Sequence, residues 1–565
     1  MNFYHKEGAY LLLSGSDIVV KSLIDEGAKI VFGYPGGQVI NIYDSLYKYQ
    51  NQIKHVLTCH EQGAAHAADG YARATGEVGV CIATSGPGAT NLVTGIATAY
   101  MDSVPLVAIT GNVPMNLLGK DSFQEVDIRG ITMPITKHNY IVKDVNKLQE
   151  VINEAFRIAK EGRPGPVLID IPKNIQIEKA EYKKLGKAKL KKFKINEQKI
   201  KSAVEMINKA KKPFIYVGGG AVASNAAEQV LALAEKLNSP ICNSLMARGV
   251  IPSEHPLYTG MIGMHGTKAS NITATKCDLF IALGARFSDR VISNSQNISN
   301  ANIIHIDIDP AEINKNVKVD LSISADLKEA LELIVSAVNE KNNEEWLESV
   351  NSLKKLPAYK IENEDVLSPK VLFDALNKVT DKDLIISTEV GQHQMWTAQY
   401  YHFKKPRTFI TSGGLGTMGF GLGAAIGAQF GRPDCKVINI AGDGSFMMNC
   451  QEIATAVSNK LPIIIIVMNN NVLGMVRQWQ TLFFDKRYSN TILNRKTDLV
   501  KLAEAFGAKG YRVREKDELD DVLSKALESD GPVLIDYRID SNKNVFPMVA
   551  PGAPINQIII ESDLD

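Results

Sequence analysis

The sequence lacks the features that would mark a membrane, secreted or nucleic-acid-binding protein. Its apolar run Pro462–Met468 is far shorter than the roughly 20 residues that cross a membrane. We find no charged segment followed by an apolar core near residue 1, so we expect no signal peptide. Charge of one sign is not in excess either, since the formal net charge is +1. We therefore expect no nucleic-acid or membrane partner and a cytoplasmic location.

Cysteine is also scarce, and its distribution argues against two further classes. None of the six cysteines forms a closely spaced pair of the kind that binds metal. Most of them lie within apolar stretches, as reduced core residues of a cytosolic protein do. The six are Cys59, Cys81, Cys242, Cys277, Cys435 and Cys450.

The length and the order of elements predict the fold class. A chain of 565 residues is too long for one hydrophobic core, and about three domains are expected. Alternating strand-like and helix-like segments predict the α/β class, with three doubly wound parallel-sheet domains. We expect these domains at residues 1–180, 195–340 and 366–565, with polar linkers at Glu178–Lys199 and Asn339–Asp365.

The first and last thirds of the chain repeat each other. The letters GPVLID occur at Gly165–Asp170 and again at Gly531–Asp536. Strands that begin at Pro105 and Pro462 each follow a glycine-rich loop and a helix, at an offset of 357 residues. Coincidental reuse of common α/β pieces is the alternative. The shared order favours two related domains that flank a different, Rossmann-like central one.

The stretch Lys436–Asn471 indicates a metal and an anion. A β-branched run ends in the letters AGDGS, and a second apolar run ends in the letters NNN. Ligands bind at such strand ends in doubly wound folds. Asp443 and Asn470 offer hard oxygen ligands suited to Mg²⁺, and the glycine-rich helix start favours a phosphate. For GDG alone, a buried strand with a tight turn is the alternative.

The GDG and NN letters, with YPGG at 34–37 and SGPG at 85–88, resemble the motifs of thiamine-diphosphate enzymes. Within that family the chain resembles the catalytic subunits of the acetohydroxyacid (acetolactate) synthases, from about Ser16 to Ile560. The resemblance implies that Asp443, Asn470 and the backbone carbonyl of Val472 hold Mg²⁺ on the cofactor's diphosphate. The phosphate contacts that it implies are Gly442, Gly444 and Ser445.

By the same resemblance, Glu61 hydrogen-bonds the aminopyrimidine ring of the cofactor. A carboxyl there shifts the ring toward its imino tautomer, and burial among Ala64, Ala65 and Ala68 should raise the Glu61 pKa. On spacing alone, a glutamate that complements the helix dipole is the alternative. In this family the glutamate meets the GDG loop of a second chain, which implies a homodimer or a homotetramer.

Other segments resemble further cofactor-holding parts of the family. Met418 matches the bulky residue that bends thiamine diphosphate into a V shape, although a lone methionine is more often core filler. His393 is expected to bind the cofactor and not to act as a base. The full set of these positions is Tyr34, Pro35, Gly36, Pro87, Asn91, Val390, Gly391, Gln392, His393, Met418 and Met475.

The central third indicates a second cofactor. Its loose G-x-G-x-x-A pattern after a strand is weak evidence for a dinucleotide. Neighbouring motifs resemble the FAD contacts of the biosynthetic synthases, where the flavin has no evident redox step. Either Asp307 or Asp309 would accept a hydrogen bond from a sugar or ribityl hydroxyl, and Ser288 departs from the Asp of many relatives. The set is Gly218, Gly219, Gly220, Met264, His265, Gly266, Thr267, Arg286, Asp289, Arg290, Asp307 and Asp309.

Substrate contacts are also implied by the resemblance. Trp479 matches a tryptophan that shapes the second-substrate pocket and favours 2-ketobutyrate, and Arg286 matches a contact to the acceptor's carboxylate. Gln124 and Lys137 lie in motifs near the active-site channel, with an ordinary solvated lysine as the alternative for Lys137. The segment Phe546–Ala553 resembles one that closes over the site.

The implied activity joins two 2-ketoacids. Pyruvate loses CO₂ on thiamine diphosphate, and the two-carbon unit passes to pyruvate or 2-ketobutyrate, the first common step of valine, leucine and isoleucine biosynthesis. The implied cofactors are thiamine diphosphate, Mg²⁺ and FAD, and a small regulatory subunit is a further partner to test for. The alternatives are a flavin-free catabolic acetolactate synthase, a 2-ketoacid decarboxylase, and a silent nucleotide-binding regulatory protein. Arg286 and Trp479 argue against the first two, and Glu61 argues against the third.

Overall fold

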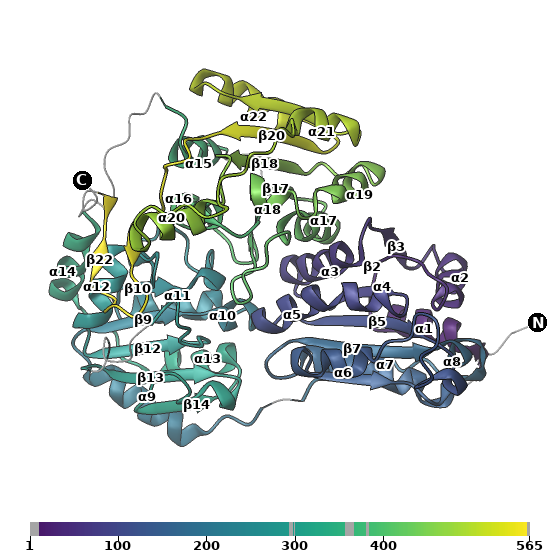
Figure 1. Cartoon of the computed structure of the whole chain (residues 1–565). Coiled ribbons are helices and arrows are strands. Elements are labelled where there is room, and N and C mark those ends of the chain that lie inside the picture. Colours follow the sequence, from purple (N-terminus) through teal and green to yellow (C-terminus); the bar gives the residue numbers. More distant parts are fainter. Residues whose placement is uncertain are drawn as a thin grey trace, which may run out of the picture.

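Three six-stranded sheets organise the chain, and all the strand pairs within them are parallel (Figure 1). The computed structural model describes residues 11–191, 193–292, 298, 300–355, 366–379 and 383–561. The expected α/β class is confirmed. In this described part of the chain, no helix combines the length and apolar content that crossing a membrane requires.

The first sheet has the strand order β3-β2-β4-β5-β7-β6. Its strands are β2 (Ile30–Gly33), β3 (Lys54–Leu57), β4 (Gly79–Ala83), β5 (Leu106–Asn112), β6 (His138–Ile141) and β7 (Pro166–Pro172). The helices are α1 (Gly15–Asp25), α2 (Ile40–Lys48), α3 (Glu61–Thr75), α4 (Pro87–Asn91), α5 (Val93–Asp102), α6 (Ile128–Thr132), α7 (Leu148–Lys160) and α8 (Lys173–Ile177). The Ser14 hydroxyl caps α1 by accepting the N–H of Asp17, as expected of a serine at a helix start.

The third sheet has the order β16-β15-β17-β18-β20-β19. Its strands are β15 (Leu384–Thr388), β16 (Phe409–Ile410), β17 (Lys436–Gly442), β18 (Ile464–Asn469), β19 (Lys509–Val513) and β20 (Val533–Arg538). The helices are α15 (Pro369–Asn377), α16 (Gln392–Tyr400), α17 (Gly421–Gly431), α18 (Asp443–Phe446), α19 (Ile453–Ser458), α20 (Gly474–Phe483), α21 (Leu499–Ala505) and α22 (Leu519–Leu527).

The first and third domains share one topology, which confirms the predicted repeat. Counted from the first strand of each domain, both sheets run 2-1-3-4-6-5. A buried hydrogen bond repeats as well: Asn112 donates to Asp170 at 2.6 Å, and Asn469 donates to Asp536 at 2.8 Å. Asn112 and Asn469 are 357 residues apart, the offset of the repeated strands. Coincidental reuse of strands would not reproduce the same side-chain pair.

The middle sheet has the order β11-β10-β9-β12-β13-β14, which is the 3-2-1-4-5-6 order of a Rossmann fold. Its strands are β9 (Pro213–Val217), β10 (Ile241–Asn243), β11 (Tyr258–Met261), β12 (Leu279–Leu283), β13 (Asn302–Asp307) and β14 (Leu321–Ser324). The helices are α9 (Glu197–Lys209), α10 (Gly220–Ala223), α11 (Ala227–Lys236), α12 (Lys268–Lys276), α13 (Leu327–Ala337) and α14 (Glu344–Lys354).

Both expected linkers are shorter than their polar composition suggested. The first contains β8 (Lys179–Tyr182), which pairs antiparallel with β1 (Leu11–Ser14), and α9 begins before its end. The second contains α14, whose Trp346 is buried and donates from its indole N–H to the Pro213 carbonyl at 3.0 Å. Residues 356–365 lie outside the described residues. These short packed elements carry charged surface residues, and their composition therefore resembles that of a linker.

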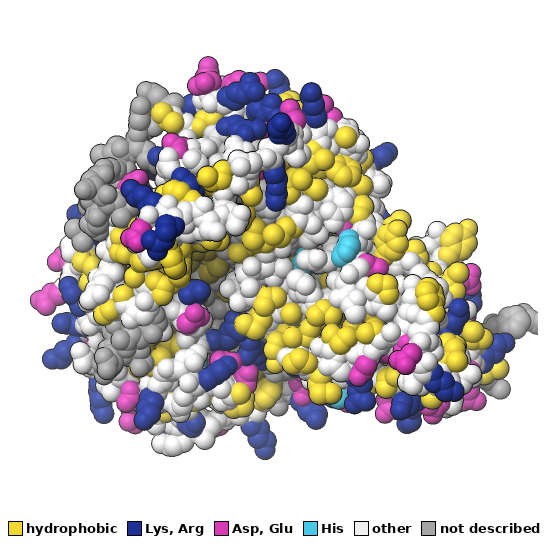
Figure 2. Space-filling view, in the orientation of Figure 1, with side chains coloured by type: hydrophobic (Ala, Val, Ile, Leu, Met, Phe, Trp, Pro, Cys, Tyr) yellow, Lys and Arg dark blue, Asp and Glu magenta, His cyan; other side chains and the backbone are white. Residues whose placement is uncertain are grey.

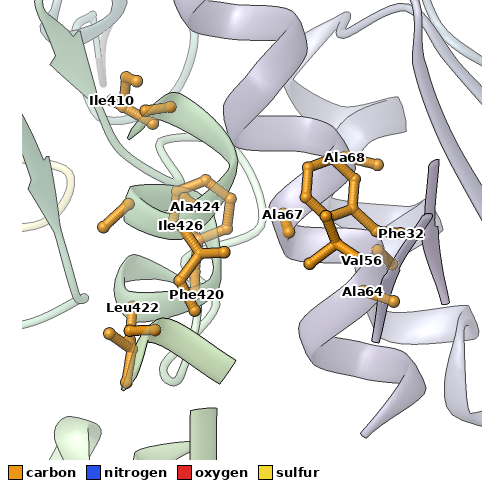
Figure 3. Packing of buried hydrophobic residues seen from close by; sticks show 14 of the residues in the cluster. Phe32, Val56, Ala64, Ala67, Ala68, Ile410, Phe420, Leu422, Ala424 and Ile426 are labelled. Carbon is orange, nitrogen blue, oxygen red and sulfur yellow. The ribbon is translucent and has the colours of Figure 1, made fainter. Parts of the chain in front are cut away.

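The first and third domains meet where α3 crosses α17 (Figure 3). A Cβ atom at Gly427 would collide with the carbonyl oxygen of Ala67, and one at Gly70 would collide with that of Ala424. The two helix backbones are therefore in direct contact, which larger side chains would prevent. The small residues of α3 therefore allow this helix to pack very closely against α17.

Candidate functional site

The predicted metal ligands lie together at one edge of the third sheet. β17 and β18 are parallel neighbours, with Gly442 paired to Met468. Asp443 begins α18 directly after β17, and Asn470 directly follows β18. Both side chains are buried. Two oxygen-bearing groups thus share the carboxyl edge, where folds of this kind bind ligands.

Asp443 is a buried carboxylate with no partner on one of its oxygens. Its Oδ1 is inaccessible to solvent and accepts no hydrogen bond. Burial raises the pKa of Asp443 to about 6, against the opposing effects of backbone N–H groups and of Arg495 and Arg538. A divalent cation would remove this desolvation cost, because it binds the ionised carboxylate directly.

The set of ligands fits a metal that is completed by a bound phosphate. Asn470 Oδ1 accepts the backbone N–H of Val472 at 3.2 Å, which fixes the turn after β18. Among the residues that the structure describes, no three or more His, Cys, Asp and Glu side chains are grouped to hold a metal ion. One carboxylate, one amide and one backbone carbonyl leave the remaining Mg²⁺ positions to phosphate oxygens and water.

A neutral histidine lies beside the GDG loop, between two glycines. A Cβ atom at Gly442 would lie 2.8 Å from Nδ1 of His393, and one at Gly391 would lie 2.8 Å from its Cε1. Burial lowers the pKa of His393 to about 3. Its Nε2 is buried without a hydrogen-bond partner. An uncharged ring in these surroundings suits the predicted binding role better than that of a base.

Glu389, which sequence reasoning did not single out, holds the Met418 loop. Its carboxylate accepts the N–H groups of Gly419 at 2.7 Å and Leu422 at 3.1 Å, and the hydroxyl of Ser445 at 2.8 Å. It is 1% exposed, and burial raises the pKa of Glu389 to about 7. One buried carboxyl thus ties the loop with Met418 to the GDG loop.

The position of Glu389 in the sequence could have identified it as a residue of the candidate site. It directly follows β15, a neighbour of β17, so its side chain enters the same sheet edge as Asp443. Because the Ser445 hydroxyl is engaged by Glu389, the predicted phosphate contact of Ser445 would depend on its backbone. Thr417 adds a link to the first domain, with its hydroxyl 2.7 Å from that of Thr98.

A second group of predicted residues lies at the carboxyl edge of the first sheet. Tyr34–Gly36 follow β2, Glu61 follows β3, and Pro87–Asn91 follow β4. The Asn91 amide donates to Glu61 Oε2 at 2.9 Å. Glu61 itself is only half-buried in one chain, although the alanines of α3 are fully buried. These alanines serve helix packing and do not enclose the carboxyl.

Gln124 and Lys137, predicted near one channel, lie at opposite edges of the first sheet. Gln124 packs on the loop after β4, where a Cβ at Gly86 would lie 2.9 Å from its carbonyl. Lys137 directly precedes β6, and its ammonium donates to the Ile158 and Glu161 carbonyls at the end of α7. Burial lowers the pKa of Lys137 to about 8. These contacts stabilise the end of α7 and do not support the substrate role predicted for Lys137.

The predicted flavin residues gather where the middle sheet reverses its strand order. Gly218–Gly220 follow β9, Gly284–Arg290 follow β12, and Asp307 ends β13. A Cβ at Gly220 would lie 2.8 Å from the Cα of Gly284, so only glycines allow these two loops to approach so closely. Rossmann folds bind dinucleotides at this switch point. The arrangement therefore fits an extended nucleotide.

Some of the predicted flavin residues have other partners. The Asp309 carboxylate lies 3.4 Å from Arg163 of the first domain and also caps the turn that follows it. Asp289 and Arg290 pair with each other at the surface, where they are 79% and 61% exposed. Of the two aspartates left open by the sequence, the geometry favours Asp307, which is buried at the end of β13, whereas the Asp309 carboxylate already has these partners.

The C-terminal segment, which falls within the range expected for the third domain, lies against the middle domain. Val549, in β21 (Met548–Val549), donates its N–H to the Met264 carbonyl at 2.8 Å, and β21 pairs with β22 (Ile558–Ile559). His265 Nδ1 lies 3.4 Å from the Pro547 carbonyl, and burial lowers the pKa of His265 to about 4. This segment therefore covers the loop with the predicted flavin residues 264–267, of which Thr267 caps α12.

Helix α20 connects the metal edge to the C-terminal segment. It carries Met475 and the half-buried Trp479, whose ring stands edge-on to Phe483 with centroids 5.7 Å apart. The buried Gln478 on this helix donates to the Val545 carbonyl at 3.0 Å. It also accepts the amide of the predicted cofactor residue Gln392 at 3.0 Å. Cofactor edge, helix and C-terminal segment are thus one packed unit.

Comparison with known proteins assigns all three domains. Models of the thiamine pyrophosphate enzymes match residues 13–131 (N-terminal TPP binding domain), 200–334 (central domain) and 389–537 (C-terminal TPP binding domain). The chain is 47% identical to the probable acetolactate synthase large subunit of Methanocaldococcus jannaschii, over 97% of this chain and 95% of that protein. It is 46% identical to the acetolactate synthase large subunit of Corynebacterium glutamicum, over 97% and 90%. It is 44% identical to the acetolactate synthase isozyme 2 large subunit of Escherichia coli, over 97% and 99%.

The buried Glu389 carboxyl predicts a dependence of stability on pH. Burial raises the pKa of Glu389 from 4.5 to about 7. Between these two pH values the folded protein keeps a proton on Glu389 that the unfolded chain has released. Stability should therefore fall as the pH rises through this interval, and the loss should be complete above pH 7. We expect the melting temperature of the protein without added ligands to fall more between pH 5 and pH 8 than that of Glu389→Gln. Thermal melts at several pH values measure this. Glu504→Gln, at an exposed position, is the control, and parallel curves for the protein and Glu389→Gln would contradict the prediction.

Proposed function

The chain belongs to the thiamine pyrophosphate enzymes, and within them to the acetolactate synthase large subunits, and from this we propose that it makes acetolactate from pyruvate. One pyruvate would lose CO₂, and its two-carbon unit would be joined to a second pyruvate, or to 2-ketobutyrate. This is the first common step of valine, leucine and isoleucine biosynthesis. The observation that carries the proposal is the buried, unpartnered Asp443 beside Asn470, in the matched C-terminal TPP binding domain.

The residues at the edge of the third sheet are suited to the diphosphate end of thiamine diphosphate. When bound, this cofactor supplies the electron sink for decarboxylation of a 2-ketoacid. Asp443, Asn470 and the Val472 carbonyl would hold Mg²⁺ against the diphosphate. Gly442 and Gly391 leave room beside the neutral His393, whose Nε2 needs a partner. Met418, held through Gly419 by Glu389, would support the cofactor between its two ends.

Glu61 is suited to the aminopyrimidine end. Asn91 occupies its Oε2 at 2.9 Å and orients the carboxyl, so Oε1 is the oxygen proposed to meet the ring nitrogen. Glu61 would hold the shared proton that selects the imino tautomer. General acid–base catalysis of this kind raises a reaction rate about 10²- to 10⁴-fold. Trp479 and the C-terminal segment would then exclude water, so that a second ketoacid and not a proton receives the two-carbon unit.

An assay of acetolactate from pyruvate tests the activity. With thiamine diphosphate, Mg²⁺ and FAD we expect acetolactate as the main product, and Glu61→Gln should lower kcat at least about 100-fold because it cannot hold the shared proton. Colorimetric detection of acetolactate measures both. Glu77→Gln, just beyond the other end of α3, is the control and should keep its activity. Acetaldehyde as the only product would instead indicate a decarboxylase.

A site divided between two chains is the second part of the proposal. Glu61 and Asp443 lie in different domains, and the first domain presents exposed apolar side chains. Phe123 is 85% exposed and Met133 is 61% exposed, and hydrophobic side chains around α5 are visible in Figure 2. Exposed apolar surface of this kind marks protein interfaces. A second copy of the chain would cover it, and the names of the relatives as large subunits support a smaller regulatory partner as well.

Complementation between two inactive variants tests the divided site. Glu61→Gln and Asp443→Asn chains should each be inactive as homodimers. A mixed dimer keeps one site with both wild-type residues, so refolded or co-expressed mixtures should regain activity through heterodimers. Acetolactate formation by the separated heterodimer measures this. The control is a dimer of two Glu61→Gln chains that carry different tags, which has no site with a wild-type Glu61 and should stay inactive. An inactive heterodimer would show that each chain builds its own site.

FAD is the third part of the proposal, and it is supported by the Rossmann order and by the glycine contact between the loops after β9 and β12. We expect the purified protein to be yellow with the absorption bands of bound flavin. Arg286→Ala should lower the flavin content, because Arg286 lies at the switch point, and Arg514→Ala in the third domain should not. Absorption spectra after removal of free flavin measure this. A colourless, fully active protein would favour the flavin-free alternative.

A further inference from the structure

A buried carboxylate of the third domain reaches into the first domain just before Glu61. Glu452 ends a short helical turn, Cys450–Glu452, and is 0% exposed. Its Oε1 accepts the backbone N–H of His60 at 3.0 Å, and its Oε2 accepts that of Cys59 at 3.2 Å. The Thr455 hydroxyl donates to Oε2 at 2.7 Å and steadies the carboxylate from its own side.

These bonds hold the start of α3 by its backbone. Glu452 accepts the N–H groups of Cys59 and His60. These two residues directly precede Glu61, the first residue of the helix. The His60 ring accepts the N–H of Gln62 at 3.0 Å, so the next donor is also occupied. The Glu61 side chain takes no part in this and is left to Asn91. The point at which Glu61 enters the site is thus set from the third domain.

Gly63 and the local charge fit this arrangement. A Cβ atom at Gly63 would collide with Oε1 of Glu452, so no larger residue leaves room for the carboxylate. Burial raises the pKa of Glu452, while the hydrogen bonds from Thr455, Cys59 and His60 oppose the rise. The positive end of the 15-residue helix α3 also favours a carboxylate there.

We propose that Glu452 is a positioning residue for Glu61, which it places through the backbone of Cys59 and His60. The proposal rests on the proposed function, because Glu61 must act on the cofactor for its place to matter. Glu452 follows Asp443 by nine positions. One short segment therefore carries the proposed metal ligand and the support of Glu61. In a dimer with divided sites, this segment touches both sites.

The variant Glu452→Gln tests this directly. Its amide keeps the shape of the side chain but turns an N–H₂ group toward one of the two backbone donors. We expect kcat to fall about 10- to 100-fold, the cost of a small misplacement, with the KM for pyruvate nearly unchanged. Hydrogen exchange of the Cys59 and His60 amides, measured by mass spectrometry without cofactor, should become faster. Gly63→Ala, which displaces the carboxylate, should give the same pair of effects.

Glu312→Gln is the matched control. Glu312 is also a buried carboxylate that joins two domains, since it accepts Arg163 of the first domain at 2.7 Å, and it lies away from the proposed site. This variant should lose stability without losing kcat. Unchanged kcat in Glu452→Gln and Gly63→Ala, with an active wild type, would overturn the proposal. If the wild type makes no acetolactate, the proposed function fails, and unchanged amide exchange in Glu452→Gln would then overturn the positioning claim by itself.

Discussion

Where α3 crosses α17, two helix backbones touch, and this contact sets the first domain against the third. Gly70 lies on Ala424, and Gly427 lies on Ala67. A side chain larger than these at the crossing would push the helices apart, because packed interiors have no spare volume. The helix that begins with Glu61 is therefore placed by contacts along its whole length. The position of Glu61, which is assigned to the aminopyrimidine end, depends on that placement.

A buried network of ion pairs also joins the first domain to the loop before Met418 in the third domain. Arg73 of α3 pairs with Asp69 and with Asp102, at 2.5 Å and 2.9 Å. Asp102 also accepts the N–H groups of Gly413 and Gly414, which lie shortly before Met418. A buried charge without its partner is costly, so these groups specify one arrangement of the two domains. Glu452 does the same from the third domain, whereas Glu389 joins two loops within that domain. Buried carboxyl groups thus determine the geometry of the proposed site.

The two related domains use one topology for different chemistry. In both, the polar residues follow neighbouring parallel strands at the carboxyl edge of the sheet. This is why Asp443 and Asn470 could be brought together from the sequence, since the strands that carry them are adjacent along the chain. The motifs of Lys137 and Asp309 gave no side-chain direction, and the contacts of both residues lie away from the roles expected of them. Lys137 lies at the amino edge, and Asp309 turns toward Arg163 of another domain.

The sequence by itself determined the fold class, the repeat, the Rossmann-like centre and the adjacency of the GDG and NN strand ends. Each of these depends on hydrophobic periodicity or on short spacing, which are local properties of the chain. Only the tertiary structure revealed Glu389 and Glu452, the depth of the alanines around Glu61 and the course of the C-terminal segment. These depend on contacts between residues that are distant in the sequence, from 30 positions for Glu389 and Gly419 to 392 positions for Glu452 and His60. A carboxylate that accepts backbone N–H groups leaves no pattern in the sequence of its partner, because every residue except proline offers that donor.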